Sequence, residues 1–222
     1  MSFVPSSDPA GAPVLHVRDL QIAFDGEAPL VRQWQADIGC GLTLLHGDTG
    51  SGKSTLLRVL AGEQPAARGT LALPHAMLHA AAPGAPSAWR RQVFFVDPGT
   101  QAFHTLTVQD CVARLRADDD GFDAAHWEAL ADAFGLAPHR DKGMHMLSTG
   151  SRRKVFLACA LASGRPLTLL DEPGAALDAA SVRALHAALE DVARESRRIV
   201  IVASGEAWAG LPWRARLSLP MA

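Results

Sequence analysis

Nine consecutive residues near the start of the chain have the types and spacing needed to hold a phosphate group. They are Gly47-Asp48-Thr49-Gly50-Ser51-Gly52-Lys53-Ser54-Thr55. The run from Gly47 to Ser54 fits the phosphate-loop pattern G-x-x-x-x-G-K-[ST]. Small residues let backbone N–H groups surround the anion, while Lys53 supplies positive charge and Ser54 supplies a hydroxyl for Mg²⁺. We therefore predict that all nine residues bind phosphate, with Lys53 also catalytic and Ser54 also a metal ligand.

A second set of candidate residues stands at the end of an apolar run. Leu167–Leu170 is followed directly by Asp171 and Glu172. A carboxylate at a strand end beside a phosphate loop is well placed to support Mg²⁺, and a neighbouring carboxylate can accept a proton from an attacking water. Paired acids also occur as ordinary loop residues, but the phosphate loop favours the functional interpretation. We predict that Asp171 supports the metal and that Glu172 is the catalytic base.

The elements that must position these residues follow from the apolar pattern. Apolar runs predict strands at residues 42–45, 93–96, 167–170 and 199–203. A helix is predicted over Ser54–Leu60, with its positive end facing the phosphates. Val14–Phe24 alternates loosely, which predicts an antiparallel strand. The alternation of strands and helices predicts an α/β domain with a mostly parallel central sheet.

Two connecting segments lack a clear period. Residues 74–88 are rich in Ala, Pro and Gly, which predicts a surface loop or insertion. The run Asp118-Asp119-Asp120-Gly121 is predicted to be a solvated loop rather than a metal site. Asp123 is placed to cap a following helix, whose apolar face includes Trp127 and Phe134. We expect those aromatic side chains to serve packing rather than a cofactor.

Length, charge and cysteine usage limit the classes of protein to which the chain can belong. Its 222 residues suffice for one domain with a small subdomain, and residues 1–13 are predicted to be a flexible tail. A formal net charge of −2 gives no reason to expect a nucleic acid partner. Three widely spaced cysteines indicate the cytosol rather than a zinc site or disulfide framework. No apolar run approaches the roughly 20 residues that span a bilayer, so membrane contact would require a partner.

Two further motifs give the sequence a family resemblance. Leu147-Ser148-Thr149-Gly150-Ser151 resembles the signature motif Leu-Ser-Gly-Gly-Gln, and Ala175-Ala176-Leu177-Asp178 resembles the D-loop. With the phosphate loop and the paired acids, these motifs follow the order and spacing of the nucleotide-binding subunits of ATP-binding cassette (ABC) transporters. The resemblance covers the chain from about Val14 to Leu219. Residues 147–178 also faintly resemble the haem-exporter ATPases of cytochrome c maturation.

The resemblance implies a fold and a site shared between two chains. The fold would be a P-loop NTPase of the ABC type over residues 14–222, with an N-terminal antiparallel β subdomain and a small helical subdomain at about 101–146. The cofactors would be ATP and Mg²⁺, with ATP sandwiched between two cassettes in a homodimer or heterodimer. Ser148, Gly150 and Asp178 would take part in nucleotide binding, with Ser148 and Gly150 reaching the γ-phosphate across the interface.

Two positions carry open alternatives. Phe24 falls where the family has an aromatic residue that stacks on adenine, and ordinary strand packing is the alternative. Thr149 replaces a glycine of the signature motif. A threonine is tolerated there if the backbone is helical and is strained if φ is positive.

Two other positions depart from the family in ways that affect catalysis. Asp97 and Pro98 stand where the family has a Gln that contacts Mg²⁺. Asp97 is a candidate Mg²⁺ ligand because it offers a hard oxygen, and Gln101 is a substitute if the loop runs longer. Gly205 stands where the family usually has a His that senses the γ-phosphate. Losing one such group lowers a rate by roughly 10²–10³-fold.

Together these features favour a subunit that binds and hydrolyses ATP, slowly because of Gly205, to power transport through separate membrane-spanning permease subunits. We expect a cytoplasmic protein that is peripheral on the inner face of the cell membrane through those partners. We also expect no appended domain after Leu219. Two alternatives stay open: an ATP-dependent dimerisation switch with little turnover, and a soluble non-transport ABC ATPase.

Overall fold

The computed structural model describes residues 12–23 and 28–219, so Phe24 and its predicted stacking role lie outside the described residues. The strands are β1 (Leu15–Ile22), β2 (Val31–Ile38), β3 (Gly41–His46), β4 (Arg68–Leu73), β5 (Ala76–His79), β6 (Val93–Phe94), β7 (Leu167–Asp171), β8 (Ile199–Ser204) and β9 (Ala215–Ser218). The helices are α1 (Lys53–Ala61), α2 (Ser87–Gln92), α3 (Val108–Arg116), α4 (Ala124–Ala133), α5 (Thr149–Ala162) and α6 (Ala179–Glu195), with 3-10 turns η1 (Ala137–His139) and η2 (Met144–Met146).

The strands form two sheets, which confirms the predicted α/β class with an antiparallel N-terminal part and a parallel central part. In the first sheet β1 pairs antiparallel with β2 and β4, and β4 pairs antiparallel with β5. The second sheet has the order β6-β7-β8-β3-β9, and its strands pair in parallel. Strand β6 is shorter than the predicted run 93–96 because its pairing with β7 ends at Phe94.

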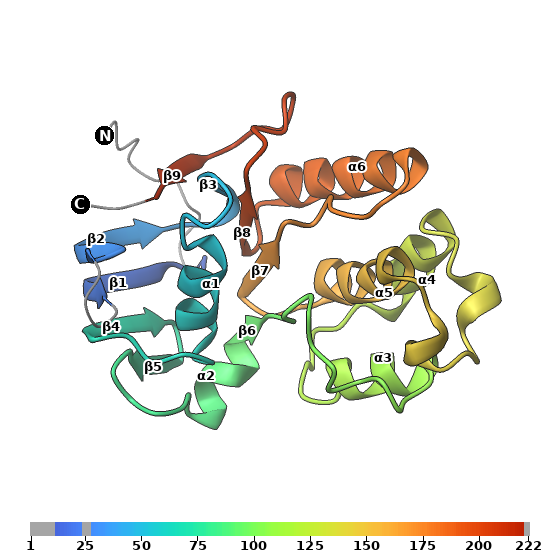
Figure 1. The fold of residues 1–222 in the computed structure, drawn as a ribbon, viewed down its shortest axis with the longest axis horizontal. Helices are drawn as coiled ribbons and strands as arrows, with labels where there is room; N and C mark the ends of the chain where they lie inside the picture. Colours follow the sequence, from blue (N-terminus) through green and yellow to red (C-terminus); the bar gives the residue numbers. More distant parts are fainter. Residues whose placement is uncertain (1–11, 24–27, 220–222) are drawn as a thin grey trace.

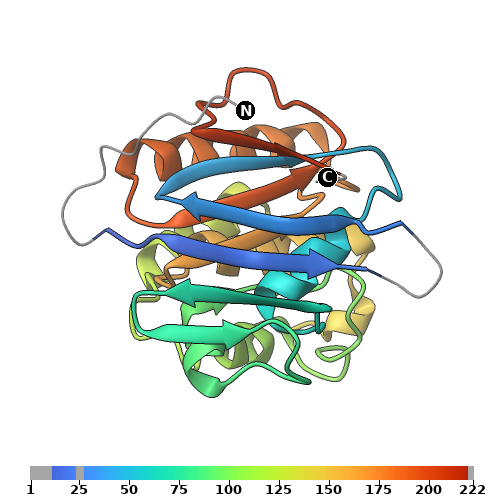
Figure 2. The same ribbon diagram turned by 90° about the vertical axis from the view of Figure 1, so that its left-hand side faces the viewer.

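The sheets and helices stack in layers. Helix α1 lies between the two sheets in Figure 1, and Figure 2 shows the antiparallel strands in front of it. Ile199 and Ile201 of β8 pack in the cluster that contains α1, whereas Val200 and Val202 pack in the cluster that contains α5 and α6. Successive side chains of a strand point to opposite faces, so the parallel sheet has a core on each side. The carboxyl ends of β3, β7 and β8 therefore meet at one edge.

The segment that we predict as a helical subdomain, residues 101–146, contains α3, α4, η1 and η2. These elements lie at the end of the molecule opposite the antiparallel sheet (Figure 1). Asp123 caps α4, as predicted, by accepting a hydrogen bond from the His126 N–H at 2.9 Å. Trp127 and Phe134 are buried in the same core as α5. Within the described ranges, no helix is long and apolar enough to cross a membrane.

One prediction about a connecting segment is wrong in part. Residues 74–88 contain strand β5, which pairs with β4 and extends the antiparallel sheet, in addition to the start of α2. A strand of four residues is too short for its alternation to stand out from an Ala- and Pro-rich composition. The apolar pattern therefore indicates only β1 of the four strands in this sheet, because β2 and β4 also lie outside the predicted runs.

The prediction that the acidic run is solvated is wrong for Asp119. Its carboxylate is buried and accepts hydrogen bonds from Ser163 Oγ at 2.6 Å and from the Gly164 N–H at 3.2 Å. Arg165 Nε lies 3.8 Å from the same carboxylate. A buried charge is tolerated when such partners are present. They come from the end of α5, more than forty residues away in sequence, so a local pattern could not reveal them.

Candidate functional site

The phosphate loop joins β3, which ends at His46, to α1, which begins at Lys53. Gly52 precedes the helix with a φ of 91°, in the left-handed region that favours glycine. A Cβ at Gly52 would also lie 2.4 Å from the Leu30 side chain. No side chain among the described residues caps α1, so the N–H groups of its first turn are available to an anion.

Lys53 is the charge at the centre of this loop, and its side chain is only 6% exposed. Its ammonium donates hydrogen bonds to the carbonyl oxygens of Gly47 at 2.7 Å and Asp48 at 3.1 Å. It also lies 3.1 Å from Glu172 Oε1. An ammonium has three N–H donors, so these three acceptors match its full capacity. The contacts bring the predicted cation beside the predicted base.

Asp171, at the end of β7, has the properties expected of a group that supports a cation. Its Oδ1 is buried and has no hydrogen-bond partner in the part of the chain that the structure describes. Burial raises the pKa of the Asp171 carboxyl, the Ser54 hydroxyl hydrogen bond lowers it, and the charges of Glu172 and Asp97 raise it further. A cation would relieve this unpaired oxygen and the excess negative charge. The residues present therefore fit Mg²⁺, with Ser54 and Asp171 as its protein partners.

Glu172 is fixed from several directions. Its φ of 42° lies in the left-handed region that non-glycine residues seldom adopt. Its N–H donates to the Ala203 carbonyl of β8 at 2.9 Å, and its Oε1 accepts a hydrogen bond from the Gly205 N–H at 3.1 Å. Gly205 thus contacts the predicted base through its backbone N–H.

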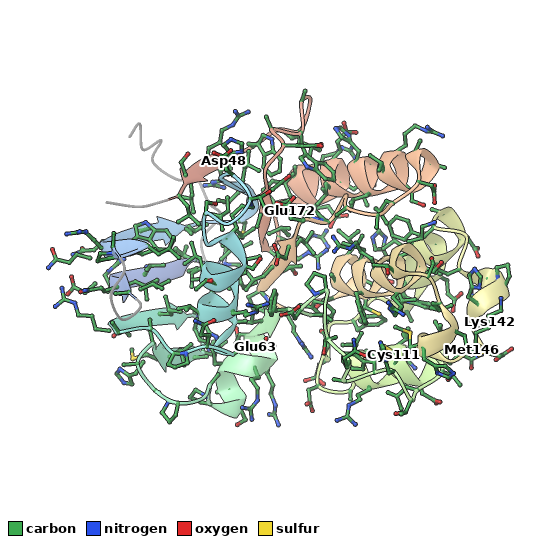
Figure 3. The ribbon with its side chains drawn as sticks, in the orientation of Figure 1. Asp48, Glu63, Cys111, Lys142, Met146 and Glu172 are labelled. Carbon is green, nitrogen blue, oxygen red and sulfur yellow. The ribbon has the colours of Figure 1, made fainter. Side chains whose placement is uncertain are left out.

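The loop, Lys53 and Glu172 line a cleft of about 820 Å³. Figure 3 shows Asp48 and Glu172 near each other in the upper middle of the molecule. The lining also includes His186, Glu206 and Trp208, for which the sequence motifs predict no role. Trp208 Nε1 donates to Ser204 Oγ at 3.1 Å, and its ring would lie 2.9 Å from a Cβ at Gly174. The one feature of the sequence that could have pointed to Trp208 is its position, four residues after the apolar strand that ends at Ser204.

Asp97 lies outside the residues that line this cleft, and its carboxylate has partners within the chain. Oδ2 accepts hydrogen bonds from Arg58 Nε at 2.9 Å and Nη2 at 2.6 Å, while Oδ1 accepts one from the Gly99 N–H at 2.8 Å. Burial works to raise the pKa of Asp97, but the Gly99 N–H and the Arg58 guanidinium hold it below its ordinary value. In this arrangement the Asp97 carboxylate pairs with the Arg58 guanidinium.

The signature motif opens helix α5. Ser148 is its N-cap, and its hydroxyl accepts a hydrogen bond from the Ser151 N–H at 3.1 Å. Thr149 is the first helical residue and has no positive φ, so the threonine carries no backbone strain. Gly150 meets the D-loop closely, because a Cβ there would lie 2.4 Å from the Ala176 carbonyl oxygen.

Asp178 ties the D-loop to the same helix. It caps α6 by accepting a hydrogen bond from the Ser181 N–H at 2.9 Å, and Lys154 Nζ lies 2.5 Å from its Oδ2. The hydrogen bond from Lys154 is the main cause that lowers the pKa of Asp178. The structure therefore groups Ser148, Gly150 and Asp178 around the start of α5, and none of the three lines the cleft. The predicted site residues fall into two separate groups.

Comparison with known proteins shows the family to which the chain is related. A sequence-family model described as ABC transporter matches residues 37–175. The chain is 33% identical over 208 residues to the molybdenum import ATP-binding protein ModC of Albidiferax ferrireducens, covering 83% of this chain and 56% of ModC. It is 37% identical over 169 residues to the cytochrome c biogenesis ATP-binding export protein CcmA of Cereibacter sphaeroides, covering 76% of this chain and 71% of CcmA.

A solved structure shares the fold. It is a Pyrococcus furiosus protein described as an ABC transporter ATP-binding protein, with a TM-score of 0.68, 21% identity, and coverage of 92% of this chain and 96% of that one. The chain spans little more than half the length of the ModC relative. The family match and the identities to ModC and CcmA place the sequence beyond chance similarity. The chain belongs to the ABC transporter family, as a nucleotide-binding subunit.

Proposed function

We propose that this chain binds MgATP in the cleft and hydrolyses it to power transport through separate membrane-spanning subunits. The observation that carries the proposal is the 3.1 Å contact between Lys53 Nζ and Glu172 Oε1, which sets a phosphate-binding cation beside a candidate base. The uncapped first turn of α1 adds N–H donors for the phosphates. Phe24 stays a predicted adenine-stacking residue.

Ser54 and Asp171 would hold Mg²⁺ together with oxygens of the substrate. Among the described residues, no cluster of three or more His, Cys, Asp or Glu side chains forms a metal site alone. This agrees with Mg²⁺, which usually binds through one or two protein ligands plus phosphates and waters. The metal would supply charge neutralisation at the β- and γ-phosphates. Both Asp97 oxygens accept hydrogen bonds within the chain, so Asp97 is not assigned to the metal.

Glu172 would act as the general base. A water oxygen attacks the γ-phosphorus as the bond from phosphorus to the bridging ADP oxygen breaks, and ADP leaves with that electron pair. Glu172 accepts the proton that the water loses, which requires the carboxylate to face the cleft. Its Oε1 already lies at the cleft, held between Lys53 and the Gly205 N–H. Lys53 stabilises the negative charge on the transferring phosphoryl group.

The second group of residues fits a site completed by another cassette, identical or not. Ser148 and Gly150 stand at the start of α5, where a helix favours anionic oxygens. They do not line the cleft of their own chain, which suits contact with ATP bound to a partner. The Lys154–Asp178 pair would hold the D-loop beside the signature motif at that interface.

Hydrolysis by this chain is expected to be slow because Gly205 supplies no side chain. His186 lines the same cleft, but its Nε2 lies 3.3 Å from the Ala209 carbonyl and its Nδ1 lies 3.3 Å from Glu190 Oε1. It is therefore engaged away from the substrate. Losing one transition-state contact costs roughly 10²–10³-fold in rate, whereas binding through Lys53 and Ser54 is unaffected.

The transport role rests on relatives whose names are those of import and export ATP-binding proteins. The switch with little turnover and the soluble non-transport ATPase gain no support from those names. The chain would act at the inner face of the cell membrane, held there by its permease. Mild-detergent isolation of the tagged chain from its own cells is expected to recover a membrane protein with several spans. Recovery with ribosomes or DNA instead would contradict the transport role.

ATP turnover of the wild type and Glu172→Gln tests the catalytic assignment. We expect Glu172→Gln to lower kcat by about 10²–10⁴-fold, because removing a general base has effects of this size. Glu128→Gln is the matched control. Glu128 is exposed on α4, away from the cleft, and pairs with Arg140. Equal rates for wild type and Glu172→Gln would remove Glu172 as the base. A wild type that binds ATP without any turnover would contradict the enzymatic function itself.

A further inference from the structure

Arg153 links the helix that carries the signature motif to the strand end that carries the catalytic carboxylates. It lies in the second turn of α5, five residues after Ser148. Its Nη1 donates hydrogen bonds to the carbonyl oxygens of Glu172 and of Asp171, the latter at 3.4 Å. The arginine therefore contacts the main chain of both acids rather than their carboxylates.

The strand end needs such support because its geometry is unfavourable on its own. Glu172 has a positive φ, a conformation that is energetically unfavourable for a non-glycine residue. Pro173 follows and offers no N–H. Ala203 fixes the Glu172 N–H, while Lys53 and Gly205 hold its carboxylate. The Glu172 carbonyl, the remaining polar group of the residue, accepts a hydrogen bond from the Ala175 N–H at 3.0 Å and a second, charge-assisted one from Arg153.

The surroundings of Arg153 are costly for a guanidinium. Burial lowers its pKa, and the nearby charges of Asp171 and Glu172 act against that shift. Its Nε is buried and has no hydrogen-bond partner among residues 12–23 and 28–219. A guanidinium that served only to solubilise the helix surface would extend into water. Arg153 instead points toward the carbonyl oxygens of Asp171 and Glu172.

The geometry points to Arg153 as a positioning residue for ATP hydrolysis, one that holds Glu172 in its positive-φ conformation so that the carboxylate faces the cleft. This rests on the proposed ATPase function. Without the guanidinium, the backbone of Glu172 can relax to an extended φ, which rotates the carboxylate away from Lys53. ATP binding depends on the phosphate loop, which Arg153 does not touch. The substitution therefore separates turnover from binding.

The test compares kcat and the equilibrium Kd for ATP in full-length wild type, Arg153→Met and Arg153→Lys. We expect Arg153→Met to lower kcat about 10-fold while Kd stays within about 3-fold, since the substitution removes one charge-assisted hydrogen bond to the Glu172 carbonyl and leaves the phosphate loop unchanged. Arg153→Lys retains a charged donor and should restore most of kcat. Arg153→Gln, which retains an uncharged donor, should give an intermediate kcat and replaces the Met variant if that variant does not fold.

Arg198 supplies the structural control, because it donates to the carbonyls of Ala160, Leu161 and Ser163 at the other end of α5. Arg198→Met should lower the thermal unfolding midpoint and leave kcat per folded molecule unchanged. An unchanged kcat in Arg153→Met, or no recovery in Arg153→Lys, would overturn the inference. So would parallel losses of kcat and ATP binding. If the wild type itself shows no turnover, the proposed function fails instead, which is a distinct result.

Discussion

The two ends of the cleft differ in the number of side-chain groups that they offer to a bound nucleotide. At the phosphate loop, Lys53 has three acceptors at hydrogen-bond distance and Ser54 bonds to the partly buried Asp171. At the end of β8, the position facing Glu172 is Gly205, which contributes a single backbone N–H. If the proposed function holds, most phosphate-binding groups lie at the first end, whereas the second end lacks one side chain that could assist hydrolysis. We therefore expect substitutions at the second end to change hydrolysis more than nucleotide binding.

The largest effect on ATP binding is expected from substitution of Lys53, at the phosphate-loop end of the cleft. Lys53→Met should weaken ATP binding by about 10²-fold, because it removes charge-assisted hydrogen bonds worth about 3 kcal/mol. Calorimetric titration with ATP measures the change. Lys142→Met is a matched control, since Lys142 is exposed and belongs to the segment before η2. An unchanged Kd in Lys53→Met would mean that the cleft does not bind phosphate through this loop.

A substitution at Asp171 sharpens the assignment of the metal. Asp171→Asn should raise the Mg²⁺ concentration needed for half-maximal turnover by about 10–100-fold, a typical effect of losing a group that supports a metal. ATP binding measured without Mg²⁺ should stay within about 3-fold of the wild type, because Lys53 and the loop N–H groups are retained. A Mg²⁺ requirement identical to that of the wild type would exclude Asp171 from the metal site.

The smallest effect is expected at Asp97, outside both ends of the cleft. The pKa of Asp97 lies below its ordinary value, so its pairing with Arg58 stabilises the fold above the ordinary pKa and is lost as the pH falls through the lowered one. Asp97→Asn should cost about 0.5 kcal/mol of unfolding free energy at neutral pH, because the pair is partly exposed. The difference should vanish in acid.

Denaturant titration at pH 7 and in acid measures the Asp97 prediction, and the Mg²⁺ requirement of Asp97→Asn serves as its functional counterpart. That requirement should equal the wild-type value. A higher requirement would support Asp97 as a metal ligand, the role that its hard oxygen and its place in the sequence predict. In that case one ligand of the metal would lie away from the phosphate-loop end of the cleft.

The parts of the site that lie on continuous motifs could be predicted from the sequence. The phosphate loop and the Asp171–Glu172 pair each sit in a short run with one strand beside it, so their types and order carry the prediction. The continuous apolar run of β8 likewise indicates a strand whose side chains are buried on both faces of the sheet. The pairing of Arg58 with Asp97 joins residues 39 positions apart, and no local pattern marks it.

The rest depends on backbone conformation and on distant contacts. The sequence left open whether Thr149 is helical, and the Ser148 cap decides that it is. Trp208 reaches the cleft because it donates to Ser204 and packs over Gly174, two segments that lie far apart along the chain. Arg153 looks like an ordinary helix-surface residue until β7 is placed beside it. Such roles require the assembled fold.

The separation of binding from hydrolysis is tested most directly at Gly205. Of the residues that the structure describes, a Cβ at this position would meet only the Gly47 carbonyl oxygen, at an ordinary 3.7 Å, so a β-carbon can be introduced there without steric conflict. Gly205→His and the control Gly205→Ala are compared with wild type by ATP affinity and by single-turnover hydrolysis. We predict that Gly205→His speeds hydrolysis by up to roughly 10²-fold with ATP affinity within about 3-fold, while Gly205→Ala changes neither. Equal hydrolysis rates in the His and Ala variants would contradict the account.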